Sequence, residues 1–384
     1  MSEGTGTPKK LKNPDNISSI TEKDTEAKTP VDTERELLGK PSAQMAAYKA
    51  LNIKAIGDVL AGQLIAKGYD VMTLATARAD EVAGDMNVSY GVAKSWIEAV
   101  QENLLMRMSM KKAVDFDKEK KAKQIFFRTN SKSFNKMLGD DATQVKATGG
   151  VATMAITGLS GQFETGKTQV CNDIVVDCLG RLKEKAVYIE TEQDTFHLDR
   201  LKEIAKARGY NCNWDDLYVC ESANIPTVKA QYLQYRLVQK SLENGENIRL
   251  VVVDSFNAKS RAGYTRTEML PVRTREFAEH FLLMDFLAAK YNIAWLLTCQ
   301  VIMAPRPEQG LQNKMKFGSE HYLVGGDIVL HSINQLISLD KISTYQCRAV
   351  LYDSSYLPRN TCEFEISSKG IIDTMITKPD KEKK

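Results

Sequence analysis

The sequence lacks long apolar runs, is poor in histidine and has no paired cysteines, and each lack argues against a class of protein. No stretch of its 384 residues approaches the ~20 apolar residues that a membrane-spanning helix needs. We therefore expect no membrane partner. There are four His, and the seven Cys lie far apart without a C-x-x-C pair. That pattern argues against a zinc centre and favours reduced, mostly buried thiols in a cytoplasmic protein.

The charge balance excludes little. The net charge is +3, and charged residues make up 26% of the chain, which is ordinary for a globular protein. So small a net charge neither demands nor excludes nucleic acid, and any DNA site has to come from local clusters of Lys and Arg. At this length the chain can form a large core domain and a smaller second one.

The most specific motif present is Gly161-Gln-Phe-Glu-Thr-Gly-Lys-Thr168, which matches the phosphate-binding loop G-x-x-x-x-G-K-T. Its glycines let backbone N–H groups turn toward a polyphosphate, Lys167 brings positive charge, and Thr168 supplies a hydroxyl for Mg²⁺. An apolar strand over 151–156 precedes it and a helix over 169–179 follows it, as the motif requires. We predict a site for ATP and Mg²⁺; the alternative is a glycine-rich turn with a chance lysine.

Composition divides the chain into five parts. The ends are polar and charged and cannot bury enough apolar surface to fold alone. The segment before the core has helical spacing, and its turn at 55–57 resembles a helix-hairpin-helix, a motif that offers backbone N–H groups to a DNA phosphate; a plain helical bundle is the alternative. The predicted parts are a disordered tail (1–40), a helical DNA-binding domain (41–108), a linker with a self-assembly motif (109–127), the core (128–375) and a disordered basic tail (376–384).

In the core, apolar strands alternate with helical segments. This order predicts an α/β fold with a mostly parallel central sheet and helices on both faces. In such sheets ligands bind at the carboxyl ends of the strands. The predicted strands after the phosphate loop are 186–189, 217–220, 249–254 and 293–300, with shorter ones at 335–339, 347–352 and 362–366, and the predicted helices are 198–206, 228–242 and 276–291.

Polar side chains stand at the ends of three of these strands. Asp254 ends one strand and can hold Mg²⁺ opposite Thr168. Glu190 and Glu192 follow another, and either can be a general base, or both can be solvated loop carboxylates. Gln300 ends a third, where a neutral amide can sense the γ-phosphate. We expect a catalytic site at this edge.

Two segments on the same edge are long and basic. We expect both to be mobile loops, and loops of this length are usually functional or disordered. Basic loops beside an ATPase site suggest an anionic polymer as partner, although ordinary solvated loops are the alternative. The first segment, 257–275, carries Arg261, Tyr264, Arg266 and Arg273, and the second, 302–323, carries Arg306, Lys314 and Lys316.

Together these motifs resemble those of the archaeal RadA recombinases, relatives of RecA, over about residues 41–375. The resemblance rests on the phosphate loop and on the segments 190–196, 253–256, 261–264, 299–301, 324–326 and 353–358. It implies a RecA-like P-loop ATPase core behind a small all-α domain. It also implies Mg²⁺-dependent ATP hydrolysis, filaments on single-stranded DNA, pairing with homologous double-stranded DNA, and strand exchange in recombinational repair.

The resemblance assigns roles by position. Glu192 would be the catalytic glutamate, acting with Lys167 and Gln300, and the two basic segments would bind DNA. Met110 and Ala113 would form the motif that joins subunits into a ring or helical filament. Arg200 would stack on adenine, and Asp353 and Pro358 would cap a neighbour's nucleotide. The nucleotide-binding set would be Gly161, Gln162, Phe163, Glu164, Thr165, Gly166, Lys167, Thr168, Gln169, Arg200, Asp353 and Pro358.

The chain departs from the family pattern at several of these positions. One residue is inserted after Glu192, so counting back from Phe196 would place Gln193 at the catalytic position, but an amide is no base. Met110 stands where the family has Phe, and Thr267 stands where it has Arg. Two alternatives to an active recombinase follow: a related regulator that binds ATP and DNA and assists another recombinase, and a hexameric helicase-type motor. Recombination mediators are possible partners, and the expected location is the nucleoid.

Overall fold

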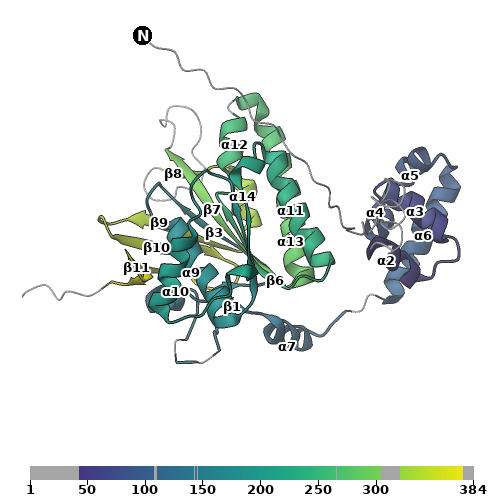
Figure 1. Cartoon of the computed structure of the whole chain (residues 1–384). Coiled ribbons are helices and arrows are strands. Elements are labelled where there is room, and N and C mark those ends of the chain that lie inside the picture. The colour runs from purple at the N-terminus through teal and green to yellow at the C-terminus, as the bar shows by residue number, and fades with distance from the viewer. Residues whose placement is uncertain are drawn as a thin grey trace, which may run out of the picture. The chain divides into compact units, whose positions relative to one another are not determined.

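The computed structural model describes residues 43–107, 110–141, 143–144, 146–264, 266–303 and 321–374. The chain divides into two compact units, one ending at Met110 and the other beginning at Lys111 (Figure 1). Within those ranges, none of the helices has the length and apolar character that a bilayer crossing requires. The predicted tails, 1–40 and 376–384, lie outside the described residues.

The first unit is helical. Its core is mostly aliphatic, with Leu64, Leu74 and Val82 fully buried, and it includes the buried rings of Tyr48 and Tyr69. The turn predicted at 55–57 lies between the first two helices, and Asp70 caps the third by accepting a hydrogen bond from the backbone N–H of Thr73 (2.8 Å). The described helices are α2 (Ala43–Leu51), α3 (Asp58–Ala66), α4 (Val71–Thr76), α5 (Ala79–Met86) and α6 (Tyr90–Arg107).

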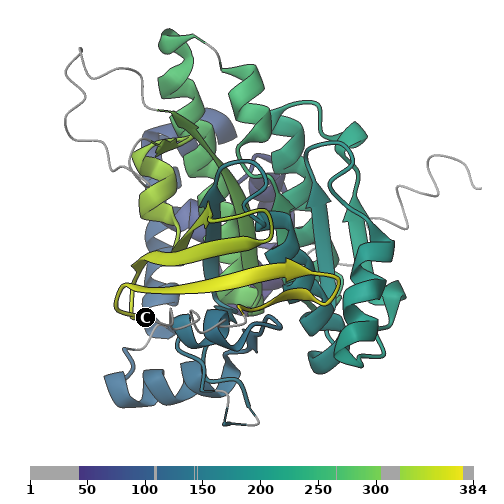
Figure 2. The same cartoon turned by 90° about the vertical axis from the view of Figure 1, so that its left-hand side faces the viewer.

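The second unit is built on a ten-stranded sheet. In the described residues the strand order is β12-β11-β10-β9-β3-β7-β6-β4-β5, and β8 pairs with β7 (Figure 2). A separate antiparallel pair joins β1 (Phe126–Phe127) to β2 (Val151–Ala152). The large sheet comprises β3 (Ala155–Gly161), β4 (Lys185–Glu190), β5 (Leu217–Cys220), β6 (Ile248–Asp254), β7 (Ala294–Met303), β8 (His321–Leu323), β9 (Gln335–Lys341), β10 (Gln346–Ser354), β11 (Asn360–Ser367) and β12 (Gly370–Asp373).

The predicted mostly parallel sheet is confirmed, with two differences. Strands β9, β3, β7, β6, β4 and β5 run parallel, whereas β9 to β12 pair antiparallel because short turns connect them. The single strand predicted over 151–156 is two strands, since Met154 between them has a left-handed φ of 58°. After this break β3 runs on to Gly161 and delivers the phosphate loop.

Helices cover both faces of the sheet (Figure 1). One face packs against α9 (Lys167–Asp177) and α10 (Leu198–Arg208), and the other against α11 (Val228–Glu243), α13 (Leu270–Tyr291) and α14 (Asp327–Ser332). Trp295 and Tyr188 are fully buried in these two cores. The shorter described helices are α7 (Ala113–Lys123), α8 (Lys132–Met137) and α12 (Ala258–Gly263), with a π-helical turn at Cys178–Leu182 and 3₁₀ turns at Trp214–Asp216, Ser222–Asn224 and Thr267–Met269.

The mobile loop predicted over 257–275 is wrong, because the described part of this segment is largely helical. It contains α12, a 3₁₀ turn and the first turn of α13. Pro271 occupies the first turn of α13, where its missing N–H costs nothing and its fixed φ favours the helix. In the second basic segment, Val301–Met303 of β7 pairs antiparallel with β8. Residues 304–320 between them, with Arg306, Lys314 and Lys316, lie outside the described residues.

Candidate nucleotide-binding site

The phosphate loop connects β3 to α9 by a backbone path that requires glycine. A Cβ atom on Gly161 would lie 2.4 Å from the carbonyl oxygen of Leu339, which no side chain tolerates. Gly166 has a left-handed φ of 89° and immediately precedes α9. The loop therefore ends at a helix N-terminus, whose free N–H groups attract anions.

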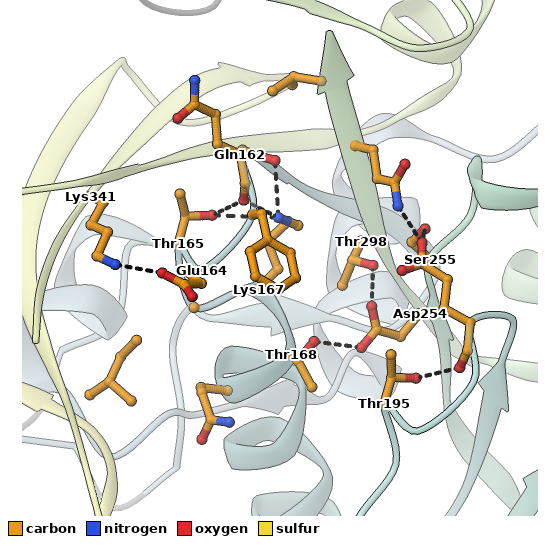
Figure 3. A pocket seen from close by; sticks show the side chains of 18 of the residues that line it. Gln162, Glu164, Thr165, Lys167, Thr168, Thr195, Asp254, Ser255, Thr298 and Lys341 are labelled. Carbon is orange, nitrogen blue, oxygen red and sulfur yellow. Dashed lines mark hydrogen bonds and ion pairs between the residues drawn. The ribbon is translucent and has the colours of Figure 1, made fainter. Parts of the chain in front are cut away.

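A cavity of about 610 Å³ opens beside this loop. All eight loop residues and Gln169 line it, together with Glu192 from the loop after β4 and the strand ends Asp254 and Gln300. Figure 3 shows Lys167, Thr168 and Asp254 among them. Thr165 closes the loop by donating to the carbonyl oxygen of Gln162 (2.9 Å). The structure thus brings together the phosphate loop and the three polar strand ends that the sequence predicted separately.

Lys167 lies inside the loop. Its Nζ donates to the carbonyl oxygens of Gly161 (2.9 Å) and Gln162 (2.5 Å). Burial lowers the pKa of this ammonium group, and nearby Asp254 opposes that shift. A partly desolvated cation held by neutral oxygens is well placed to bind a polyphosphate in the loop.

Asp254 ends β6 and accepts hydrogen bonds from three hydroxyls. Its Oδ2 accepts from Tyr188 Oη (2.8 Å). Its Oδ2 also accepts from Thr168 Oγ1 (2.7 Å) and its Oδ1 from the Thr298 hydroxyl (Figure 3). The carboxylate is 4% exposed. Carboxylate and hydroxyl oxygens beside a phosphate site are the donors that Mg²⁺ uses in nucleotide-binding proteins, so Thr168 and Asp254 fit the predicted metal role.

Tyr188 and Thr298 contact the candidate metal ligand Asp254, but no sequence motif singled them out. They stand on β4 and β7, the two neighbours of β6, each two residues before the polar strand end that was predicted. Because strand residues two apart face the same side, the alternation of side chains was a signal that could have found both.

The two glutamates after β4 have different environments. Glu190 Oε1 accepts from the backbone N–H groups of Thr195 (2.9 Å) and Phe196 (3.1 Å), so it holds the loop that leaves the strand. Glu192 lines the cavity, and its Oε1 accepts from Ser255 Oγ (2.8 Å) and from the Gln300 amide. Gln193 is exposed. The geometry therefore favours Glu192 over Glu190 and Gln193 as the residue that meets a substrate.

Gln300 links the cavity to α12. Its Nε2 donates to Glu192, and its Oε1 accepts from Arg261 Nη1 (3.2 Å). Arg261 lines the cavity as well, although the sequence placed it with the DNA-binding residues. Three polar side chains from the β4 exit loop, β7 and α12 thus form one chain of hydrogen bonds.

Other predicted nucleotide-binding residues lie outside the lining of this cavity. Arg200 donates to Gln169 Oε1 (2.9 Å), to the carbonyl oxygen of Ser368 (3.1 Å) and to that of Ser367, so its guanidinium braces α10 against β11 and the turn before β12. Asp353 and Pro358 are exposed.

The predicted DNA-binding residues of the first segment have different environments. The Tyr264 hydroxyl donates to Glu276, and burial raises its pKa to about 12. Arg266 is exposed. Arg273 Nε is buried without a hydrogen-bond partner among the described residues, and burial lowers the pKa of this side chain. Of the predicted self-assembly residues, Met110 is fully exposed and Ala113, exposed as well, begins α7.

A phosphate loop between β3 and α9, with a carboxylate at the end of β6 and a mostly parallel sheet, defines a P-loop nucleotide-binding protein with a RecA-like core. The family profile described as Rad51 matches residues 120–374, and the chain belongs to this family. It is 29% identical over 335 residues to the DNA repair and recombination protein RadA of Ignicoccus hospitalis, which covers 84% of this chain and 94% of that relative. The resemblance to archaeal RadA proteins is thereby confirmed, and the chain is a RecA-like DNA repair and recombination protein.

Proposed function

We propose that this protein is a DNA-dependent ATPase that forms filaments on single-stranded DNA and catalyses homologous pairing and strand exchange. The hydrogen-bonded chain of Glu192, Gln300 and Arg261 carries the proposal. It starts in the phosphate-loop cavity and ends on α12, within the basic segment that was predicted from the sequence to bind DNA. Such a chain gives a physical route from nucleotide to DNA. The relative from Ignicoccus hospitalis, named a DNA repair and recombination protein, supports the same activity.

The residues of the cavity divide the chemistry of ATP hydrolysis among them. The phosphate loop and Lys167 would cradle the β- and γ-phosphates, and Thr168 with Asp254 would hold Mg²⁺, which neutralises phosphate charge when bound. Glu192 is the proposed general base that takes a proton from the attacking water. Gln300 would orient that water or sense the γ-phosphate, since its amide already bonds Glu192.

Assembly and DNA contact complete the proposal. Met110 and Ala113 would join one copy to the next, and Asp353 and Pro358 would cap the nucleotide of a neighbouring copy. Single- and double-stranded DNA would meet the two basic segments, and the turn at 55–57 would offer backbone N–H groups to a DNA phosphate. We propose a cytoplasmic, nucleoid-associated protein that works with recombination mediators.

The test compares Glu192→Gln with Glu190→Gln. ATP turnover is measured with and without oligo-dT, and strand exchange is measured on a homologous duplex. Both substitutions keep the size of the side chain and remove one charge. Glu192→Gln should lower DNA-stimulated turnover by about 100-fold or more, the ordinary contribution of a general base. Glu190→Gln should keep most of the turnover, because its Oε1 can still accept from Thr195 and Phe196.

Three other results would contradict this assignment or favour one of the two alternative functions. Normal stimulated turnover in Glu192→Gln would contradict the assignment of the base. DNA binding without stimulated turnover in the unmodified protein would favour the regulator. Closed rings that unwind duplex DNA, seen in place of helical filaments by electron microscopy, would favour the helicase-type motor.

A further inference from the structure

The side chain of Asn257 joins three segments around the cavity. Asn257 follows β6, precedes α12 and is completely buried. Its Oδ1 accepts from the backbone N–H of Gln300 (2.8 Å). Its Nδ2 donates to the carbonyl oxygens of Gln300 (3.1 Å) and Val324 (3.1 Å). One amide thereby connects the start of α12, the strand β7 and the residue that follows β8.

Gln300 connects the three hydrogen bonds of the Asn257 side chain to the nucleotide site. Its side chain bonds Glu192 and Arg261 in the cavity, while its main chain is held by Asn257 on both sides. Val324 adds a second link, because its N–H donates to the carbonyl oxygen of Gln300 (3.2 Å). A buried amide that makes three hydrogen bonds resists separation from its partners, since breaking them leaves unsatisfied polar groups. A displacement of Gln300 must therefore carry residues 257 and 324 with it.

We propose that Asn257 is a positioning residue that couples the nucleotide cavity to α12 and to the β7–β8 strand pair, so that nucleotide and DNA binding strengthen one another. The inference rests on the proposed function, because it requires both ligands to bind. Coupling between two sites is a free energy shared by both, so each ligand changes the affinity of the other by the same factor.

The three hydrogen bonds require an amide group on a side chain of the length of Asn. An Asn side chain both accepts and donates, and Asn257 uses both abilities. In Asn257→Asp, a carboxylate could still accept from Gln300 N–H, but its other oxygen would face two carbonyl oxygens without a proton to share. In Asn257→Ala all three bonds are lost. The two variants therefore remove different numbers of these hydrogen bonds, and neither changes residue Gln300 itself.

The experiment measures the Kd of a fluorescent oligo-dT with and without a non-hydrolysable ATP analogue and Mg²⁺. In the unmodified protein we expect the analogue to tighten DNA binding by about 5–150-fold, the usual range for coupled sites. Asn257→Ala and Asn257→Asp should each reduce this ratio to below about twofold. The reverse measurement, analogue affinity with and without DNA, must give the same factors.

Asn135→Ala is the matched control. Asn135 is also a buried amide in the second unit, and it bridges the N–H and the carbonyl oxygen of Thr129 (2.8 Å each) without touching Gln300. The Asn135→Ala variant should show the same ratio of oligo-dT Kd values, without and with the analogue, as the unmodified protein. Circular dichroism melts confirm that each variant is folded. If Asn257→Ala does not fold, Asn257→Asp decides the question alone.

The outcomes separate this inference from the function on which it rests. Folded Asn257 variants with an unchanged ratio would overturn the coupling role and leave the proposed function standing. An equal loss in Asn135→Ala would also overturn it, because the effect would then be general destabilisation. An unmodified protein that binds no DNA, or shows no effect of nucleotide on DNA binding, would contradict the proposed function and with it this inference.

Discussion

At the scale of single residues, His280 shows how burial sets a charge state. It lies on the inner face of α13 with 2% of its surface exposed, among the rings of Tyr232, Tyr235, Phe256 and Phe277. Its Nδ1 has no hydrogen-bond partner in the described part of the chain. Burial lowers the pKa of this imidazole to about 4. The folded protein therefore holds His280 neutral at pH values where a solvated histidine is charged.

This difference in pKa predicts a loss of stability in acid. Between pH 6.5 and pH 4 the unfolded chain binds a proton that the folded chain does not, so the free energy of unfolding falls as pH falls. From pH 7 to pH 5 the His280 contribution should fall by about 2 kcal/mol. Urea unfolding at pH 7 and at pH 5 measures the free energy of unfolding. The variant His280→Phe, whose ring fills the same aromatic cluster, should lose about 2 kcal/mol less between the two pH values than the unmodified protein.

Other titrating groups are common to the variant and the unmodified protein, so the difference between them isolates His280. Identical pH slopes for His280→Phe and the unmodified protein would show that the ring titrates normally in the fold.

At the scale of elements, a buried ion cluster holds α9 and α10 together. Asp173 and Asp177 stand one turn apart on α9, and both are completely buried. Arg208, at the end of α10, contacts Asp173 (3.3 Å) and Asp177 (3.0 Å), and Arg181 contacts Asp177 (2.6 Å). The cluster fixes the helix that carries the phosphate loop.

The same carboxylates also accept from backbone groups of other segments. Asp177 accepts from the N–H of Arg128 (2.8 Å), and Asp173 accepts from the N–H groups of Asn130 and Ile371 (3.1 Å each). The cluster thus joins both helices to the chain after β1 and to β12. Its many partners explain how two adjacent carboxylates are tolerated in a core.

Removing Arg208 should therefore be costly. Arg208→Ala leaves two buried carboxylates short of a counter-charge, and we expect a loss of about 3–5 kcal/mol in the free energy of unfolding. Arg348→Ala is the control, because Arg348 pairs with Glu363 (2.9 Å) at a site where both side chains are about half exposed. It should cost about 1 kcal/mol or less. Denaturant titration measures both, and equal losses would refute the role given to the cluster.

At the scale of the whole molecule, assembly depends on exposed surface. Helix α7 carries apolar side chains that are exposed to solvent. In the described chain none of its residues is buried, and Val114 and Phe116 are 64% and 57% exposed. Met110 precedes it and is fully exposed. We propose that a neighbouring copy covers part of this exposed apolar surface. This supports the proposed role of Met110 in joining subunits.

Met110→Glu should block self-assembly and leave the monomer folded, because a buried contact would have to desolvate the new carboxylate. The measurement is molar mass by light scattering, with circular dichroism to confirm the fold. Met106→Glu is the control, since Met106 on α6 is also exposed but lies outside the proposed joining motif, four residues before Met110. If Met110→Glu had the same oligomer mass as the unmodified protein, Met110 would not belong to the joining motif.

The sequence alone determined what depends on contiguous residues. The phosphate loop is recognisable because its glycines, Lys167 and Thr168 act from one turn of chain, and the strand ends Asp254 and Gln300 are recognisable because each closes an apolar run. The alternation of strands and helices likewise predicted the α/β core, since a parallel sheet needs a crossover between its strands.

Only the tertiary structure decided what depends on neighbours distant in the chain. The strand order β7-β6-β4 brings Thr298 and Tyr188 to Asp254, and this order is not written in any local pattern. The path of one loop separates Glu190, which holds backbone, from Glu192, which faces the cavity. The folding of 258–263 into α12 turns Arg261 toward Gln300. In each case the deciding contact joins segments whose approach is set by packing of the whole sheet.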